Sequence, residues 1–329
     1  MSVKTIFITG ASGALGSSIV PLLLDLQPSR IYILLRAKSP QQLKERLNEL
    51  LAYWDLKAEN SSIISVQGDI TEEGFGINSG LLEEIIQSTT HIIHSAATVK
   101  MNMTEQEAQQ SSVRSTENML KIASSGLQKG VLQKIEYVST VGIAGKMRGS
   151  VPETPITTPR EFHNTYESSK TKAEELVLQK INAGWPITIH RPSMVVGDSK
   201  TGKTIHFQIF YYFTDFLTGK HTGGFFPIIE NVKLDTIPSD YVARIIVWSM
   251  QESSAIGKIF HSTSGPKEAI VVHELAKKVQ NFYKDKKYGL PAPKPVSVKV
   301  FKLALYLSLI HISEPTRLRR ISYAVFCLK

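Results

Sequence analysis

The chain has 329 residues, of which 42% are hydrophobic and 20% charged, enough for a large buried core and unlike a disordered chain. Its formal net charge of +9 comes from scattered Lys and Arg residues rather than a basic run, so we expect no nucleic-acid partner. The single cysteine, Cys327, excludes an intramolecular disulfide bond and fits a cytoplasmic protein. No signal-peptide pattern follows Met1, and the most apolar late stretch, Phe301–Ile312, is too short to be an integral membrane segment. His91 and His94 lack further ligands at metal-binding spacing, so no metal site is expected.

Short apolar runs alternate with longer segments of helical periodicity through the first part of the chain. The predicted strands are Thr5–Thr9, Arg30–Leu35, Ser62–Gln67, His91–His94, Lys134–Ser139 and Pro186–His190. The predicted helices are Leu15–Leu26, a helix that begins at Ser39-Pro40 and runs through Tyr53, Glu105–Ser125 and Tyr166–Ile181. This alternation predicts an α/β fold, with a Rossmann-type, doubly wound parallel sheet covered by helices on both faces.

After Pro192 the alternation gives way to a stretch rich in Gly, Thr and aromatic residues. Two later segments, Ile237–Met250 and Val272–Tyr283, again look helical. The predicted domains are an NADP-binding Rossmann domain over residues 1–198, with a returning segment near 235–250, and a smaller interleaved C-terminal substrate-binding lobe over residues 199–306.

The segment Leu307–Lys329 reads LSLIHISEPTRLRRISYAVFCLK. Both of its halves, LSLIHISEPTR and ISYAVFCL, resemble the translation of a sequencing adapter. We therefore expect an artefactual tail here, to which no fold prediction applies. Because the tail contains Cys327, the rest of the sequence holds no cysteine, which excludes a cysteine nucleophile.

A glycine-rich turn, TGASGALG, follows the first predicted strand and opens the first predicted helix. Glycines at this spacing allow a tight turn, close approach of the backbone to a pyrophosphate and close packing of the helix on the strand. The phosphates would lie against the N–H groups at the helix N-terminus. The turn therefore predicts a dinucleotide site formed by Gly10, Ser12, Gly13, Ala14, Leu15 and Gly16.

The residues after the second predicted strand indicate which dinucleotide binds. A site for NAD has a carboxylate here for the ribose 2′-hydroxyl, yet this chain has Arg36, with Lys38 nearby and no Asp or Glu between Asp25 and Glu45. A guanidinium can bind a 2′-phosphate through two hydrogen bonds, so NADPH is the expected cofactor. The alternative is that Arg36 is simply a solvated residue at a strand end. Asp69 follows the third strand and is either an acceptor for the adenine amino group or a cap of its own turn.

A tyrosine and a lysine four residues apart open the helix predicted at Tyr166. Tyr166 and Lys170 share one helix face, and the ammonium is expected to lower the pKa of the phenol. Tyr166 would donate a proton to an oxygen whose carbon receives a hydride, and Lys170 would also hydrogen-bond the nicotinamide ribose. Thr140, which follows the fifth strand, is expected to polarise the carbonyl through its hydroxyl, with Ser139 as its rival.

Short motifs connect these sites along the chain. They are TGASGALG (Thr9–Gly16), LLRAKS (Leu34–Ser39), GDIT (Gly68–Thr71), HSAATV (His94–Val99), VSTVGIAG (Val138–Gly145), YESSK (Tyr166–Lys170), HRPSMVVGDSKTG (His190–Gly202) and IPSDYVARII (Ile237–Ile246). In this order they resemble the extended short-chain dehydrogenase/reductase superfamily, and more narrowly its thioester-reductase and fatty acyl-CoA reductase branch of the male-sterility type. The resemblance covers about residues 3 to 280.

The resemblance implies roles for individual residues. Arg36 would contact the 2′-phosphate, and Thr140, Tyr166 and Lys170 would form the catalytic group. The further cofactor-binding residues that it implies are Lys38, Asp69, Ile70, Ser95, Ala96, Ala97, Pro192, Ser193 and Val195, the last three along the nicotinamide. The chain departs from the family where an Asn-Val-x-Gly-Thr pattern is usual, because Ser112–Thr116 reads Ser-Val-Arg-Ser-Thr.

The resemblance implies an NADPH-dependent oxidoreductase that reduces an acyl thioester, on coenzyme A or on a carrier, to an aldehyde. Since a fold does not determine a substrate, a sugar-nucleotide epimerase, a dehydratase and a ketone reductase of the same fold remain alternatives. A non-catalytic NADP-sensing protein is another, which would need the glycine turn but not the Tyr–Lys pair. The sequence assigns no oligomeric state.

Overall fold

The computed structural model describes residues 4–57, 62–100, 103–228, 232–286 and 288–306, and the predicted adapter-derived tail lies outside the described residues. The chain divides into two compact units. The first unit comprises residues 1–206 and 237–262, and the second comprises residues 207–236 and 263–329. The domain boundaries expected from the sequence stay a prediction.

A seven-stranded sheet forms the centre of the first unit. Its strands are β1 (Thr5–Thr9), β2 (Arg30–Leu35), β3 (Ile63–Gln67), β4 (His91–His94), β5 (Lys134–Val138), β6 (Ile187–Pro192) and β11 (Ile259–Ser262). All are parallel and lie in the order β11-β6-β5-β4-β1-β2-β3, so the direction of winding reverses between β1 and β4. In such sheets, ligands bind beyond the carboxyl ends of the strands at this reversal. The predicted Rossmann-type, doubly wound fold is confirmed.

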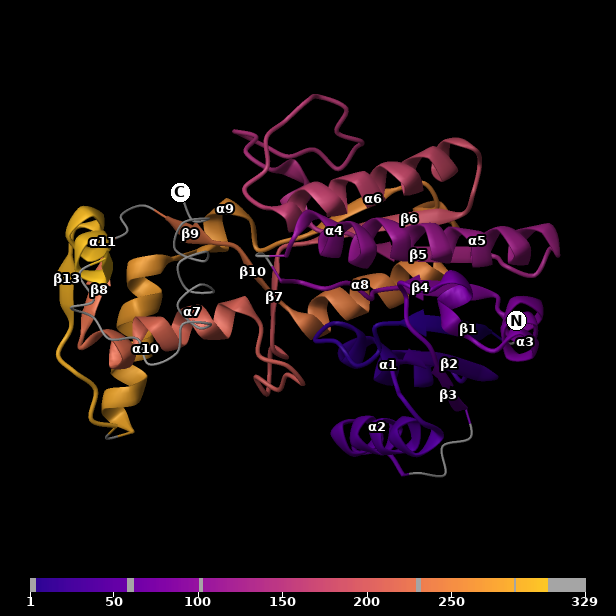
Figure 1. Cartoon of the computed structure of the whole chain (residues 1–329), viewed down its shortest axis with the longest axis horizontal. Coiled ribbons are helices and arrows are strands. Elements are labelled where there is room, and N and C mark those ends of the chain that lie inside the picture. The colour runs from indigo at the N-terminus through magenta and orange to yellow at the C-terminus, as the bar shows by residue number, and fades with distance from the viewer. Residues whose placement is uncertain (1–3, 58–61, 101–102, 229–231, 287, 307–329) are drawn as a thin grey trace. The chain divides into compact units, whose positions relative to one another are not determined.

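Helices cover both faces of this sheet (Figure 1). On one face lie α1 (Gly16–Leu24), α2 (Pro40–Tyr53) and α8 (Ser239–Gln251), and on the other lie α3 (Ser79–Ser88), α5 (Ser115–Gln128) and α6 (Thr165–Asn182). The first layer packs residues such as Ile19 and Ile246 against Ile8, and the second packs Met119 and Val177 into a cluster with Tyr137. Because both faces are buried, the central strands are almost continuously apolar.

The helix predicted over Glu105–Ser125 forms, and it contains a π-helical turn that was not predicted. The structure has α4 (Glu105–Ala108), then the π-helical turn η2 (Gln109–Arg114), and then α5. A π turn inserts an extra residue into a helix, and over so short a stretch it leaves no distinct sequence signal. The Ser112 hydroxyl accepts a hydrogen bond of 3.2 Å from Ser169 on α6, so the turn contacts the helix that carries Tyr166.

The second unit is smaller, and its strands are short. Its main elements are α7 (Ile209–Leu217), β8 (Phe225–Pro227), β9 (Lys233–Leu234), α9 (Gly265–Glu268), β12 (Ile270–Val271), α10 (Val272–Asp285), β13 (Lys294–Val296) and α11 (Val298–Tyr306). Strand β13 pairs in parallel with β8, and β12 pairs antiparallel with β9. Phe216 on α7 and Phe301 on α11 pack edge to face, with ring centroids 5.8 Å apart. Two further strands, β7 (Met194–Val196) and β10 (Thr236–Pro238), lie near the points where the chain passes between the units.

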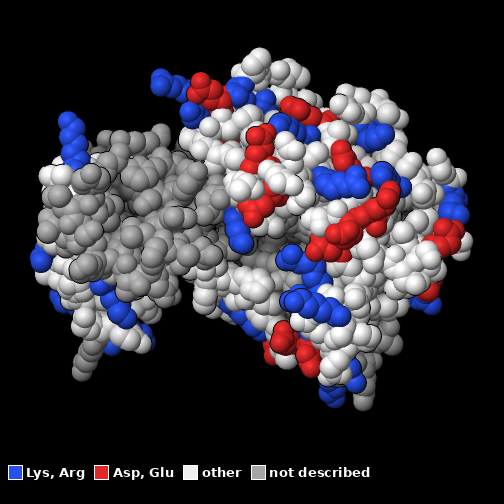
Figure 2. Space-filling model, in the orientation of Figure 1, with Lys and Arg blue, Asp and Glu red and all other residues white. Residues whose placement is uncertain are grey.

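The surface of the first unit carries charges of both signs. Figure 2 shows Lys and Arg side chains interspersed with Asp and Glu over its visible face. Several form exposed ion pairs, such as Arg30 with Glu84 at 2.8 Å and Lys146 with Glu161 at 2.9 Å, which contribute little to stability. Among the described residues, no helix is both long enough and apolar enough to cross a membrane.

Candidate active site

The predicted site residues lie beyond the carboxyl ends of the parallel strands. The glycine turn follows β1, Arg36 and Lys38 follow β2, Asp69 and Ile70 follow β3, Ser95, Ala96 and Ala97 follow β4, Thr140 follows β5, and Ser193 follows β6. Pro192 is the last residue of β6, and Val195 lies in β7. Since the carboxyl ends of parallel strands share one edge of a sheet, the fold gathers these residues at that edge.

The glycine turn is packed too tightly for side chains at two positions. Gly10 has φ +80°, and a Cβ there would lie 2.7 Å from the Ala96 nitrogen. A Cβ on Gly16 would lie 2.0 Å from the Gly10 oxygen, because the first turn of α1 packs directly on the turn. The Gly13 nitrogen donates to the Gly10 oxygen at 2.8 Å, which closes the loop. This compact backbone at a helix N-terminus is the arrangement that a pyrophosphate requires.

The buried His94 side chain stabilises the loop that follows β4. Its Nδ1 and Nε2 atoms hydrogen-bond the hydroxyls of Thr9, at 3.0 Å, and Ser115, at 3.1 Å. Burial lowers its pKa to about 3, so the ring is neutral. The Thr9 hydroxyl also accepts from the Ala96 nitrogen, so this chain of contacts holds Ser95 and Ala96 beside the glycine turn. Among the described residues, no group of three or more His, Cys, Asp or Glu side chains could hold a metal ion.

Arg36 has a neighbour that the local sequence does not reveal. Its side chain is 74% exposed, and one guanidinium nitrogen lies 4.0 Å from the Asp69 carboxylate. The other carboxylate oxygen of Asp69 accepts from the nitrogen and the hydroxyl of Thr71, each at 2.9 Å, which caps the turn after β3. A carboxylate therefore does lie close to Arg36, on a neighbouring strand end, although the guanidinium keeps most of its surface open.

Thr140 and Tyr166 lie in direct contact. Thr140 caps the 3-10 helix η3 (Val141–Ala144), where its hydroxyl accepts from the Gly142 nitrogen at 3.1 Å. Tyr166 lies in the first turn of α6, whose N-cap is Asn164. The Thr140 side chain interacts with the phenol and lowers the pKa of Tyr166, but burial is the larger effect and raises that pKa to about 12. The phenol is therefore protonated at neutral pH, the form that a proton donor needs.

Lys170 is buried one helical turn further along α6, with 3% of its surface exposed. Its Nζ donates to the Val138 carbonyl at 2.9 Å and lies 5.0 Å above the centre of the Tyr137 ring. Burial lowers its pKa to about 8, against the opposing charge of Glu174. The expected lowering of the Tyr166 pKa by Lys170 is not what the structure has, because burial raises that pKa and the group that lowers it is Thr140.

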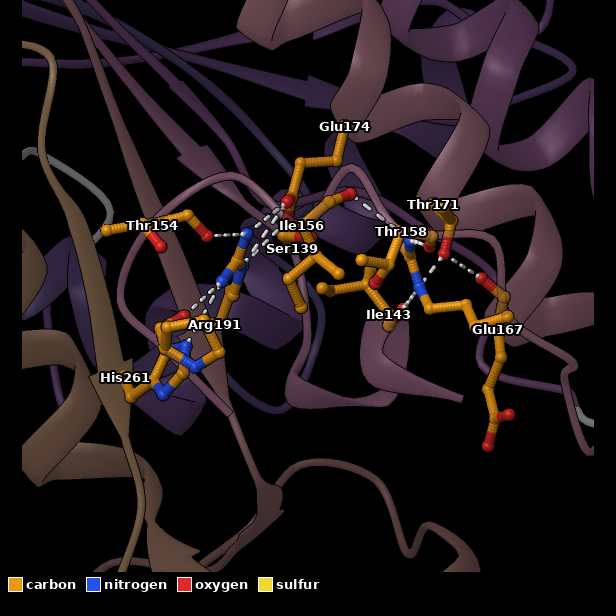
Figure 3. A network of polar contacts seen from close by, with 12 residues as sticks. Ser139, Ile143, Thr154, Ile156, Thr158, Glu167, Thr171, Glu174, Arg191 and His261 are labelled. Carbon is orange, nitrogen blue, oxygen red and sulfur yellow. Dashed lines mark hydrogen bonds and ion pairs between the residues drawn. The ribbon is translucent and has the colours of Figure 1, made fainter. Parts of the chain in front are cut away.

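Ser139, the alternative to Thr140 for polarising the carbonyl, forms a hydrogen bond with a residue of α6. Its hydroxyl donates to the Glu174 carboxylate at 2.5 Å, and Glu174 in turn pairs with Arg191 at 2.6 Å (Figure 3). The sequence reasoning missed both Glu174 and Arg191. A signal was available, because Glu174 follows Lys170 by four residues on the same helix and Arg191 interrupts an apolar strand.

Ser193 carries a buried hydroxyl at the end of β6. Its nitrogen donates to the Ser262 carbonyl at 2.9 Å, which ties the segment to β11. Within the described part of the chain, neither the Ser193 nor the Ser262 hydroxyl oxygen has a hydrogen-bond partner. Buried hydroxyls without partners are costly, and this pair borders the segment assigned to the nicotinamide. The residues present therefore fit a bound nicotinamide cofactor, because the Ser193 and Ser262 hydroxyls are available to hydrogen-bond it.

Known proteins with similar sequences are reductases and synthetases. An L-2-aminoadipate reductase of Schizosaccharomyces pombe is 29% identical over 284 residues, covering 80% of this chain and 19% of that protein. A Drosophila melanogaster protein named as a fatty acyl-CoA reductase is 27% identical over 313 residues, covering 80% of this chain and 55% of that protein. A glycine betaine reductase of Emericella nidulans is 25% identical over 273 residues, and the matched region is 21% of its length. The chain thus spans about a quarter or less of several of these relatives.

Solved structures show the same fold. The terminal R domain of the myxalamid PKS-NRPS pathway superposes with a TM-score of 0.81 at 24% identity, covering 100% of this chain and 79% of that one. A thiolation-reductase di-domain from an archaeal non-ribosomal peptide synthetase superposes with a TM-score of 0.75 at 22% identity, covering 98% of this chain and 66% of that one.

The match to a family profile covers most of the structured chain. It extends over residues 8–246, from β1 through the glycine turn and Tyr166 to α8, and the profile is that of an NAD-binding family described as "Male sterility protein". The matched region thus contains the glycine turn and the Thr140, Tyr166 and Lys170 positions at the sheet edge. The resemblance read from the sequence motifs is confirmed, and the chain belongs to the male sterility protein family of NAD(P)-binding domains.

Proposed function

We propose that this protein is an NADPH-dependent oxidoreductase that reduces an acyl thioester to an aldehyde. The observation that carries the proposal is the contact between Thr140 and Tyr166, with the buried Lys170 one turn away. These two hydroxyls lie at the carboxyl edge of the sheet, where a nicotinamide cofactor of this fold presents its reactive carbon. They form a pair of donors suited to an oxygen that gains negative charge.

The chain's own residues would act at the carbonyl oxygen. NADPH supplies the hydride that adds to the thioester carbon. As the C–O π electrons move to oxygen, the hydroxyls of Thr140 and Tyr166 stabilise the charge, and Tyr166 donates its proton. When the C–S bond breaks, Tyr166 takes the proton back, the thiolate leaves and an aldehyde forms. The balance is one thioester, one NADPH and one proton giving an aldehyde, a thiol and NADP⁺.

The relatives support the thioester as the substrate class. Three matched proteins are named as reductases of aminoadipate, glycine betaine and fatty acyl-CoA. The first two substrates are carboxylic acids and the third is a thioester, so all three carry a carbon at the carboxyl oxidation level. One structural neighbour joins a reductase to a thiolation domain, so its acyl group is presented on a carrier. The chain resembles only part of most of these proteins, and the choice between coenzyme A and a carrier is an outcome of the test.

The test is a substrate panel with the purified protein. We expect oxidation of NADPH with acyl-CoA thioesters or with acyl-pantetheine, together with release of a free thiol and formation of an aldehyde in equal amounts. Turnover of ketones or sugar nucleotides instead would assign a different reaction on the same fold. NADPH binding without turnover of any of these substrates would support the sensor alternative.

Arg36 is proposed to select NADPH over NADH. Its exposed guanidinium lies where the 2′-phosphate is expected and is only loosely paired with Asp69. Arg36→Asp should reverse the preference, because the new carboxylate and Asp69 would together repel the phosphate. Dissociation constants for both cofactors, measured by fluorescence titration, test this prediction. Arg30→Asp is the control, because it makes the same charge change at the opposite end of β2. Equal affinity of the native protein for both cofactors would contradict the assignment.

A further inference from the structure

A buried ion pair lies beside the candidate active site. Arg191 on β6 and Glu174 on α6 have side chains that are 0% and 4% exposed, and their closest atoms are 2.6 Å apart. The Arg191 Nε lies 3.2 Å from both carboxylate oxygens. One of these oxygens also accepts the Ser139 hydroxyl at 2.5 Å. We call these three residues the Ser139–Glu174–Arg191 group.

The group belongs to a regular set of contacts between the end of β5 and one face of α6. Three successive residues at the strand end each contact one of three helix residues spaced four apart, which share a helix face. The pairs are Val138 with Lys170, Ser139 with Glu174, and Thr140 with Tyr166. On the strand side, Ser139 lies directly between Val138 and Thr140, whereas on α6 Glu174 lies one turn beyond Lys170 and two turns beyond Tyr166.

Arg191 also holds the irregular segment that leads into α6. It donates to the carbonyls of Pro152 and Thr154, at 3.0 and 3.2 Å, and lies 3.2 Å from the Nε2 atom of His261. Figure 3 shows the guanidinium with Thr154 and His261 on one side and Glu174 on the other. Every nitrogen of the guanidinium thus has a partner, so the geometry of the pair is strongly constrained.

A second arginine, Arg160, hydrogen-bonds the same irregular segment and the turn that Thr140 caps. Arg160 donates to the Ile143 carbonyl at 2.6 Å and to the carbonyls of Ile156 and Thr158 at 3.2 and 3.0 Å. Ile143 belongs to η3, the turn that Thr140 caps. The segment between η3 and α6 contains no regular element longer than a turn among the described residues, and these two guanidiniums supply hydrogen bonds to its carbonyls.

Stability alone is a poor reason for such a group. Removing two charges from water is energetically costly, and apolar residues of similar volume often stabilise a core equally well. What a fully hydrogen-bonded pair does provide is a defined geometry. A proton donor must be held at a fixed position relative to the reacting oxygen, because a small displacement of the donor reduces the rate strongly.

We infer that the Ser139–Glu174–Arg191 group positions the end of β5 against α6, and thereby sets the distance between the hydroxyls of Thr140 and Tyr166. None of the three residues touches the reacting atoms, so they are positioning residues. The inference rests on the proposed function, in which these two hydroxyls hold the carbonyl oxygen.

Ser139→Ala is the test, because it removes one hydrogen bond and leaves the Glu174–Arg191 pair intact. Ser249→Ala is the matched control. Ser249 on α8 is buried, and its hydroxyl donates at 3.0 Å to Glu136, a buried glutamate that also lies on β5 but contacts the other helix layer. Each variant therefore loses one buried Ser–Glu hydrogen bond to the same strand.

Ser139→Ala should lower kcat at least about tenfold, as expected for a displaced donor, while the KM for NADPH changes less than about twofold. Ser249→Ala should lose similar thermal stability but keep its kcat. Equal kcat values in the native protein and Ser139→Ala, or equal losses in both variants, would overturn the positioning role and leave the proposed function standing.

A second measurement separates the two proposals. Hydrogen exchange of the backbone amides in Val138–Ala144 should become faster in Ser139→Ala than in Ser249→Ala, whatever the substrate is. If the native protein turns over no thioester, the proposed function fails, and the exchange data still decide whether the group holds this segment. If hydrogen exchange in Ser139→Ala is unchanged, the group does not position this segment, even if the enzyme is active.

Discussion

Tyr166→Phe should abolish most of the turnover while leaving the fold and NADPH binding intact. The substitution keeps the ring and removes only the hydroxyl that contacts Thr140. If this hydroxyl donates the proton, the rate should fall by roughly a hundredfold or more, the usual contribution of a positioned acid. The measurement is kcat for NADPH oxidation, together with the dissociation constant for NADPH and the melting temperature.

The control for this variant is Tyr241→Phe. Tyr241 lies on α8 with 47% of its surface exposed, so it loses the same hydroxyl without a site contact. Its turnover should stay native. Full activity in Tyr166→Phe would mean that another group protonates the oxygen, and the assignment of Tyr166 would have to be withdrawn.

Lys170→Met should reduce both turnover and affinity for NADPH. Methionine fills a similar volume but removes the ammonium, which is expected to reach the nicotinamide ribose and to act with Tyr166. We expect a loss of about a hundredfold in kcat/KM, within the range for groups of this kind. Lys172→Met is the control, since Lys172 is on the same helix, half exposed and paired only loosely with Glu105 at 3.6 Å.

The pH dependence gives Lys170 a second readout. Burial lowers its pKa to about 8, so the ammonium loses its proton as the pH rises through that value, and turnover should fall there. Folding stability should change in the opposite direction. Between about 8 and the ordinary value of 10.5, the unfolded chain binds more protons than the folded one, so this residue's contribution to stability rises with pH. A rate that stays flat to pH 9.5 would argue against a charged Lys170 in the reaction.

Local patterns were sufficient to predict most of the sheet, while the roles of the site residues stay a prediction. The glycine turn lies between a strand and a helix, and the strong alternation of apolar runs identified six of the seven strands. Strand β11 was not predicted because Ile259–Ser262 is short, carries polar residues and pairs with β6 across a long stretch of chain. Tertiary pairing, not local propensity, makes it a strand.

The contacts within the site were harder to predict. Asp69 approaches Arg36 only because β2 and β3 are neighbours that end at the same level. The two residues are 33 positions apart in the sequence, so no local pattern connects them. The same holds for Arg191, whose partner lies on another element. Sequence periodicity indicates which face of a helix or strand a residue occupies. It does not indicate which polar side chains on two different elements will hydrogen-bond each other.

The helix α8 and the strand β11 belong to the first unit although they follow part of the second unit in the sequence, and this order affects folding during synthesis. Residues 207–236 are synthesised before Ile237–Ser262, yet the edge strand β11 and one helix of a helix layer, α8, come from this later segment. The nucleotide-binding unit therefore cannot be completed on the ribosome until residue 262 has emerged, well after Tyr166 and Lys170. During that interval β6 has an unpaired edge and the apolar face of α1 lacks its α8 partner, and such surfaces favour aggregation and chaperone binding. The nascent chain thus still exposes these surfaces after the candidate catalytic residues Tyr166 and Lys170 have been synthesised.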